Sequence, residues 1–480
     1  MSPPPVILWY RDDLRLADHA PLRAAVASGA PLIPLFILDG TTPGKWRPGA
    51  ASRWWLHHSL AALAADLAGL GSRLVIRRGD SLEVITTLVH QCQARALYFH
   101  RSHEPAQVVL EERLWRELGE KLEIRRFRGR LLQEPEQVRT GAGEAFRVFT
   151  PFWKACLRLP EPEAPLPAPA RLAPTPSEVT GLELDSLQLL PRTPDWAAGL
   201  REQWRPGEAG ARLRLETFCE EALTGYAAGR DQPGRPGTSR LSPHLHFGEI
   251  SPRQVWQAVR GVQATDAATT RGGDAYLREL GWREFCHHLL HQWPQLPEQP
   301  FNPRFADFPW RDDGEAFRAW TRGQTGYPLV DAGMRELWHT GWMHNRVRMV
   351  TASFLVKHLL VPWQQGQDWF WDTLVDANLA NNAGGWQWVA GCGADAAPYF
   401  RIFNPVLQGL KFDPHGDYAR RWLPELRRLS DKDIYAPFAA NPASLAAAGV
   451  RLGVDYPEPL VEHDFARRRA LGALETLKSA

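Results

Sequence analysis

Residues 386–405, WQWVAGCGADAAPYFRIFNP, are the most informative stretch of this 480-residue chain. Two shorter stretches belong with it: TSRLS at 238–242 and GWMHNRVRM at 341–349. The stretches at 341–349 and 386–405 lie in a region rich in tryptophan, since 12 of the 21 tryptophans fall between Trp282 and Trp422. Core and helix packing explain most of these indoles, but a few occupy positions that packing alone does not explain.

The composition is that of an ordinary globular protein, with 44% hydrophobic and 23% charged residues, and the length predicts two or three domains. Apolar runs end within a few residues, and the N-terminus has no basic region followed by an apolar core. We therefore expect neither a membrane span nor a signal peptide. Five scattered cysteines are typical of a reducing cytoplasm. The net charge is only +2, so a nucleic-acid partner would need a local basic patch.

The first third of the chain alternates between strand and helix patterns. Strands are expected at Val6–Tyr10, Leu32–Leu38, Arg73–Ile76 and Ala96–Phe99, and helices at Pro21–Val26, Arg53–Leu70 and Val108–Leu118. This alternation implies right-handed crossovers and a parallel sheet covered on both faces. The region has neither a Gly-x-Gly-x-x-Gly fingerprint nor a Gly-Lys-Ser/Thr phosphate loop. A Rossmann-like topology is therefore expected without the usual cofactor-binding turn.

The composition changes to Pro, Ala and Glu between Pro160 and Pro176, which predicts an extended linker stiffened by proline. Beyond about Arg205 helical periods dominate, at Ala275–His291, Glu315–Thr321, Val330–Trp338, Met343–Leu360 and Gln367–Val375. We therefore predict an α/β domain over 1–132, an interdomain linker over 133–204 and an all-α domain over 205–480. The residues past Asp455 are expected to form a short polar tail.

The three stretches resemble the signatures of the DNA photolyase/cryptochrome family, and the resemblance runs from Val6 to about Leu426. By this resemblance we expect the chain to be most like a bacterial class I-type cyclobutane pyrimidine dimer photolyase. The resemblance implies an antenna domain, a helical FAD-binding catalytic domain, ultraviolet-damaged DNA as the partner, and a monomer in the cytoplasm. It also implies the activity of a deoxyribodipyrimidine photo-lyase, in which photoexcited reduced FAD passes an electron to a flipped-out dimer. A dimer stacks and pairs poorly, which lowers the cost of flipping it.

Two helices carry the residues that the resemblance assigns to the DNA lesion. Glu279, Trp282 and Arg283 are spaced i, i+3, i+4 and share a face, as do Asn345 and Met349. Taken alone, these groups would be a surface patch and a core methionine. By resemblance, the two indoles pack against the dimer, Glu279 and Asn345 hydrogen-bond it, and the cations hold backbone phosphates. The implied DNA-contact set is Arg230, Glu279, Trp282, Asn345, Arg346, Met349, Trp388, Arg401 and Gln408.

The flavin site is likewise implied by resemblance. Hydroxyls and free N–H groups at a helix start suit phosphates, and the same residues would suit a simple helix cap. Arg348 would pair with Asp376 near the ring, and Asn382 would face flavin N5. Asn378 stands where many relatives have Asp, so we expect an altered redox poise. The implied cofactor set is Tyr226, Thr238, Ser239, Arg240, Leu241, Ser242, Arg283, Arg348, Asp376, Ala377, Asn378 and Asn382.

Trp310, Trp363 and Trp386 match a family electron-transfer chain, so with Glu279 and Asn382 they complete the predicted catalytic set. Without the resemblance they would be three core tryptophans. We expect no metal: His287 and His291 are spaced i, i+4, but no acidic residue follows in the pattern that zinc requires.

A second, antenna chromophore is an open question. In one folate-binding branch an Asn-Glu pair contacts the pterin, and the matching positions here are Ala106 and Gln107. This argues against a folate of that type and leaves a deazaflavin, a flavin, another folate mode or an empty site.

Three other functions compete with dimer repair. A cryptochrome-like photoreceptor would share the fold and flavin site; the intact lesion-pocket set and the absence of a long C-terminal extension favour repair. A 6-4 photoproduct photolyase usually has a histidine where Met349 stands. A DNA-binding flavoprotein without photochemistry would leave the tryptophan positions unexplained.

Overall fold

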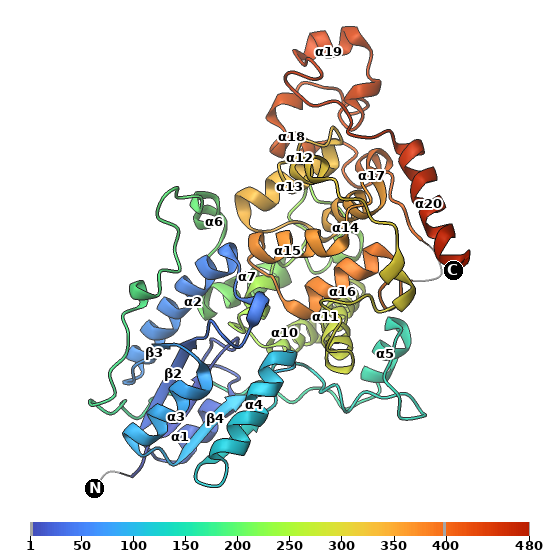
Figure 1. The fold of residues 1–480 in the computed structure, drawn as a ribbon. Coiled ribbons are helices and arrows are strands. Elements are labelled where there is room, and N and C mark those ends of the chain that lie inside the picture. The colour runs from blue at the N-terminus through green and yellow to red at the C-terminus, as the bar shows by residue number, and fades with distance from the viewer. Residues whose placement is uncertain (1–2, 397–399, 480) are drawn as a thin grey trace.

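The computed structural model describes residues 3–396 and 400–479, so residues 397–399 of the 386–405 stretch lie outside the described residues. Figure 1 shows a strand-and-helix part (blue) joined to a larger helical part. Within the described residues, the first part holds a five-stranded parallel sheet in the order β3-β2-β1-β4-β5. Its strands are β1 (Val6–Tyr10), β2 (Leu32–Leu38), β3 (Val75–Arg78), β4 (Ala96–His100) and β5 (Glu123–Phe127).

All five residues of strand β1 are buried, as expected for a parallel sheet whose two faces are both covered by helices. The helices between the strands are α1 (Ala20–Ala27), α2 (Ala50–Gly69), α3 (Ser81–Cys92) and α4 (Pro105–Leu118). Strand β5 and helix α3 were not predicted. Strand β5 reads EIRRF and lies at the edge of the sheet with three of its residues exposed, so it lacks the apolar run that marks the other strands.

The C-terminal part is helical, and the predicted fold class, an α/β domain followed by an all-α domain, is confirmed. Apart from one isolated bridge between Leu452 and Tyr456, the described residues from 205 onward form helices and loops. The α-helices are α7 (Glu208–Glu221), α8 (Tyr226–Gly229), α9 (Ser242–His246), α10 (Pro252–Thr265), α11 (Thr270–Gln292), α12 (Gly314–Thr321), α13 (Pro328–Thr340), α14 (Asn345–Ser353), α15 (Trp363–Thr373), α16 (Leu379–Ala390), α17 (Pro405–Phe412), α18 (Asp417–Trp422), α19 (Pro442–Ala448) and α20 (His463–Ser479). Short 3-10 helices are η1 (Gly44–Trp46), η2 (Leu184–Leu187), η3 (Ala267–Thr269), η4 (Pro303–Asp307), η6 (Pro424–Leu426) and η7 (Pro437–Ala439).

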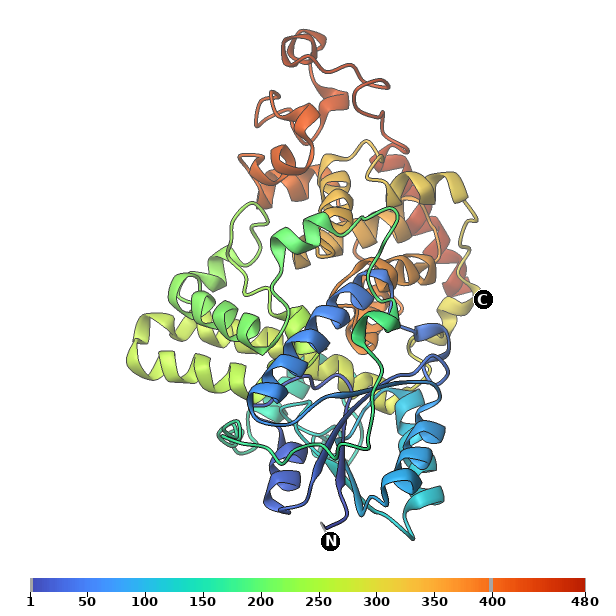
Figure 2. The same ribbon diagram turned by 90° about the vertical axis from the view of Figure 1, so that its left-hand side faces the viewer.

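Two helical predictions need correction. The single helix expected over Met343–Leu360 is instead α14 followed by a π-helical turn, η5 (Phe354–His358). The expected polar tail past Asp455 contains α20, which packs against η5. Its buried face consists of alanines, among them Ala466 and Ala470, and so gives little hydropathy signal. Figures 1 and 2 both place α19 at the end of the molecule away from the sheet, and α20 runs back from there along the side of the helical part.

The segment between the two parts is packed against both of them. It contains α5 (Phe149–Cys156) and α6 (Ala198–Gln203) as well as η2. Leu172 joins one hydrophobic core cluster of the sheet part and Val179 the other. Helix α5 instead packs on α11 of the helical part.

The sheet part and the helical part share a core. Sheet residues such as Val6 and Leu8 belong to the same buried cluster as Phe247, Trp342 and Val375 of the helical part. A buried hydrogen bond crosses this contact, since Trp55 Nε1 donates to Glu249 Oε1 at 3.0 Å. The two parts are therefore held in a fixed relation. Among the residues described, none of the helices combines the length and apolar character that a membrane span requires.

Candidate functional site

The segment from Thr238 to Ser242 leads through a tight turn into helix α9. Arg240 adopts a left-handed conformation with a φ of 52°. The hydroxyl of Ser239 accepts hydrogen bonds from the Tyr276 hydroxyl at 3.0 Å and from the Leu241 N–H at 3.3 Å. Tyr276 of α11 thus fixes the buried side of the segment, while Thr238 and Ser242 keep accessible surface. Tyr226, the other predicted phosphate-site residue, is buried with its ring 5.2 Å from that of Tyr276.

A buried carboxylate, Asp376, joins three parts of the predicted flavin site. Its Oδ2 accepts a hydrogen bond from the Ser242 hydroxyl at 2.5 Å and pairs with Arg348 at 2.8 Å. The indole N–H of Trp342 donates in turn to Ser242 at 3.2 Å. The Arg348–Asp376 pair is the one that the resemblance implied. Oδ1 of Asp376 is buried without a partner, so this carboxylate keeps a free acceptor.

Helix α16 begins beside this carboxylate. Asn378 is its N-cap, because the side-chain oxygen accepts a hydrogen bond from the Asn381 N–H at 3.1 Å. The amide therefore supplies the cap that an aspartate would also supply, but without a charge. Asn382 is buried one turn later and donates to the Gln367 carbonyl at 3.0 Å, while Ala377 is buried just before the helix.

The three tryptophans of the predicted electron-transfer chain differ in burial. Trp386 on α16 and Trp363 on α15 are buried, whereas Trp310 is half-buried. The ring of Trp386 lies 4.9 Å from Phe370 and 6.2 Å from Trp320, and that of Trp310 lies 4.3 Å from Phe308. Trp310 is therefore the most accessible of the three indoles. The route between the three indoles stays a prediction.

A chain of charges connects the predicted lesion contacts. Arg230 pairs with Glu279 of α11, and Arg346 of α14 pairs with Asp231 at 2.8 Å. Arg230 also lies 3.9 Å from Asp231, so the four side chains form one connected row. The neighbouring carboxylate of Glu279 raises the pKa of Arg230 in spite of its partial burial. Asp231 was not predicted, and its only sequence signal is its position next to Arg230.

The remaining predicted lesion-site residues outside α11 lie on α14, α16 and α17 and in the segment between α16 and α17. Asn345 is exposed and Met349 half-buried on α14. The guanidinium of Arg401, which is exposed, lies 5.8 Å from the centre of the half-buried Trp388 ring. Gln408 on α17 has its side-chain oxygen buried without a partner.

The side chain of Arg283 contacts different partners from those of Glu279 and Trp282 on the same helix. Glu279 faces Arg230 and Trp282 stacks on Phe149, whereas Arg283 donates to Glu284 at 2.8 Å and to the Arg130 carbonyl at 2.9 Å. Glu284 also accepts from the Leu132 N–H at 2.7 Å, and burial raises its pKa to about 7. The three residues, which share one face of α11 by their spacing, therefore contact different partners, and Arg283 binds the segment that leaves the sheet.

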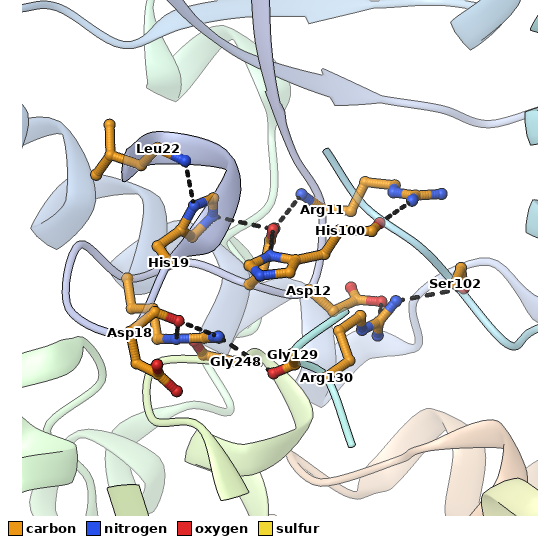
Figure 3. A network of polar contacts seen from close by, with 12 residues as sticks. Arg11, Asp12, Asp18, His19, Leu22, His100, Ser102, Gly129, Arg130 and Gly248 are labelled. Carbon is orange, nitrogen blue, oxygen red and sulfur yellow. Dashed lines mark hydrogen bonds and ion pairs between the residues drawn. The ribbon is translucent and has the colours of Figure 1, made fainter. Parts of the chain in front are cut away.

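A buried polar cluster that the sequence did not reveal lies where β1 and β4 end (Figure 3). Asp13 Oδ2 contacts His100 Nδ1 at 2.7 Å and His19 Nε2 at 3.0 Å. Burial lowers the pKa of His100 to about 3. Burial alone would raise the pKa of Asp13, but hydrogen bonds from the two imidazoles outweigh it and hold that pKa well below the usual value.

Among the described residues, these three side chains form the one cluster whose ligand atoms lie close enough together to bind a metal ion. The hydrogen bonds argue for a different role. The Leu22 N–H donates to His19 Nδ1 at 3.1 Å, so the neutral ring carries its proton on Nε2, the nitrogen that faces Asp13. His19 thus donates to the carboxylate and has no free electron pair for an ion at that position. We assign the cluster to holding the loop after β1 against the end of β4.

Comparison with known proteins places the chain in a family. Residues 6–170 match the family model described as DNA photolyase, and residues 276–476 match the FAD binding domain of DNA photolyase. The chain is 48% identical over 475 residues, 99% of its length and 98% of the relative's, to a deoxyribodipyrimidine photo-lyase of Agrobacterium fabrum. It is 40% identical to cryptochrome-1 of Arabidopsis thaliana, over 98% of this chain and 70% of that protein. The chain belongs to the DNA photolyase/cryptochrome family.

A solved structure corrects the expected class. The structure superposes with a TM-score of 0.96 on that of a bacterial class III photolyase from Agrobacterium tumefaciens, which is 48% identical, covering 100% of this chain and 99% of the other. The similarity to a class I-type enzyme that the sequence suggested is therefore not supported. The FAD-binding domain and the fold expected from the resemblance are confirmed.

Proposed function

We propose that this chain is a class III deoxyribodipyrimidine photo-lyase, which uses light to repair cyclobutane pyrimidine dimers in DNA. Similarity to the Agrobacterium enzymes supports the activity and the class. The observation that carries the proposal is helix α14. It supplies Arg346 to the row of charges around Glu279, and Arg348 to Asp376. Residues two apart on a helix point to nearly opposite sides, so one short helix connects the predicted lesion wall with the predicted flavin wall.

FAD fits the site on the chemistry of its donors and acceptors. The unpartnered Asp376 Oδ1 would accept a hydrogen bond from a ring N–H, and the accessible Thr238 hydroxyl would donate to a phosphate. Bound in its fully reduced form, FAD supplies the electron that light drives into the dimer and takes it back after the ring opens. The residues that would hold it are Tyr226, Thr238, Ser239, Arg240, Leu241, Ser242, Arg348, Asp376, Ala377, Asn378 and Asn382.

The side chains of this protein would position the lesion. Glu279 would accept a hydrogen bond from a pyrimidine imide, and the half-buried Trp282 and Trp388 would pack on its flat faces and exclude water. Three guanidinium groups would bind phosphates flanking the flipped bases, a contact that positions the DNA without reading its sequence. These cations are Arg230, Arg346 and Arg401.

The test is repair itself. Anaerobically reduced protein is incubated with ultraviolet-irradiated oligo(dT) under blue light, and the recovery of thymine absorbance is compared with a dark control. We expect recovery only in the light. No recovery by protein that retains FAD and photoreduces it would favour the alternative functions, a cryptochrome-like photoreceptor or a 6-4 enzyme.

Several expectations stay predictions from the sequence: the domain boundaries at 132 and 204, a second chromophore in the N-terminal domain, a monomeric state and a cytoplasmic location. Gln107, one of the two positions compared with the folate-binding pair, accepts a hydrogen bond from Arg11 at 3.0 Å. The polar end of this side chain is therefore already engaged within the protein, which supports the argument against that mode of folate binding.

A further inference from the structure

Phe149 and Trp282 form the closest aromatic stack at the predicted lesion site. Their ring centroids are 3.8 Å apart and the planes differ by 10°. Phe149 is almost fully buried at the start of α5, whereas Trp282 on α11 is half-buried. Phe149 therefore covers one face of the indole, and Trp282 keeps the remainder of its surface accessible.

Phe149 is itself fixed from several sides. Its N–H donates to Asp395 in the 386–405 stretch at 3.4 Å, and the guanidinium of Arg278 lies 5.6 Å from its ring centre. The ring also lies 5.9 Å from that of Phe285, which in turn makes an edge contact with Trp282. A ring held in this way leaves the indole little freedom to rotate, because any rotation would break a parallel stack.

We infer that Phe149 is a positioning residue for lesion recognition. It fixes the plane of Trp282 so that the uncovered indole face is already oriented for a flipped pyrimidine dimer. This inference rests on the proposed function, since it requires that Trp282 contacts the lesion. Because Phe149 belongs to α5, the segment between the two domains would contribute to the lesion site. Phe149 would not touch DNA, so its effect would pass entirely through Trp282.

A fixed ring saves the ordering cost that a free ring would add to binding. Replacing Phe149 by leucine keeps an apolar side chain but removes the stack. We expect the affinity for dimer-containing DNA to fall about 2- to 12-fold, which corresponds to an ordering cost of about 0.5–1.5 kcal/mol for one side chain that must be immobilised on binding. The affinity for undamaged DNA should stay unchanged, because phosphate contacts do not involve this indole. Phe149→Tyr, which keeps an aromatic ring, should retain lesion affinity.

The experiment measures dark binding of FAD-loaded variants to matched duplexes with and without one dimer, together with FAD content and thermal stability. Phe152→Leu is the matched control. Phe152 lies on the same helix and is equally buried, but its ring contacts are with Phe146, Phe285 and His288. Equal losses of discrimination in Phe149→Leu and Phe152→Leu would show a merely structural role and overturn the inference.

A double-mutant cycle tests the role of Phe149 separately from the proposal that Trp282 contacts the lesion. In a Trp282→Ala background, Phe149→Leu should cost no further lesion affinity, because the two residues act through one indole. A full additional loss in that background would overturn the inference. If Trp282→Ala by itself left lesion affinity unchanged, the lesion-site assignment of Trp282 would fail, and the inference with it. Wild-type repair under light would still report separately on the proposed activity.

Discussion

Replacing Glu279 by alanine tests the lesion site most directly. In the DNA-free protein this carboxylate pairs with Arg230, and the two side chains keep 27% and 22% of their surface exposed. On lesion binding, the carboxylate would give up this partner and accept a hydrogen bond from the dimer, while Arg230 would turn to a phosphate. The substitution should therefore weaken binding of the lesion but not binding of the DNA backbone.

The magnitude follows from these two contacts. A hydrogen bond to a charged group contributes about 1.5–3 kcal/mol, and a partly exposed ion pair contributes about 0–1 kcal/mol. Exchanging the ion pair for the lesion contact then leaves a net gain of about 0.5–3 kcal/mol. Losing this gain corresponds to about a 2- to 160-fold decrease in the preference for damaged over undamaged duplex.

The assay measures the dissociation constants of FAD-loaded protein for damaged and for undamaged duplex in the dark. The repair yield is then measured under light. Asp231→Asn is the control, because it also loosens Arg230 and Arg346 without removing a lesion contact. It should shift both affinities alike and leave their ratio unchanged. An unchanged ratio in Glu279→Ala, with normal FAD content and stability, would refute the assignment of Glu279 to the lesion.

Three further predictions concern the flavin and the domain contact. Trp363→Phe should slow photoreduction of oxidised FAD and leave repair by chemically reduced enzyme intact; equal photoreduction rates would exclude Trp363 from the chain. Asn378→Asp should keep the α16 cap and the melting temperature but make the FAD reduction potential more negative, measured by redox titration, since a carboxylate disfavours added electrons nearby. Burial raises the pKa of Glu284 from 4.5 to about 7, so its contribution to stability is lost as the pH rises through that range. Glu284→Gln should remove this slope, so that its stability relative to wild type, measured by denaturant unfolding, rises with pH across that range; an unchanged slope would contradict the argument.

Local patterns decided the fold class and the candidate residues. The buried run Val6–Tyr10 marks a strand of a parallel sheet because such strands are covered on both faces. The helical periods from 205 onward predicted an all-α part because a buried helix face repeats at the helix period. The residues of the 238–242, 341–349 and 386–405 stretches identified the family. Element ends were less certain, as at the π-helical turn after Ser353, because cap and turn geometry depends on neighbours far away in the chain.

Only the tertiary structure decided which of these residues meet. It joined Ser242, Arg348 and Asp376, which lie far apart in sequence, and it separated Arg283 from Trp282, which are adjacent. Phe149 is the clearest case, since nothing in its local pattern distinguishes it from Phe152 on the same helix. A contact across 133 residues depends on how α5 docks on α11, and that docking is set by the whole core rather than by either helix. Sequence therefore determined the chemistry available to this protein, and packing determined which groups act together.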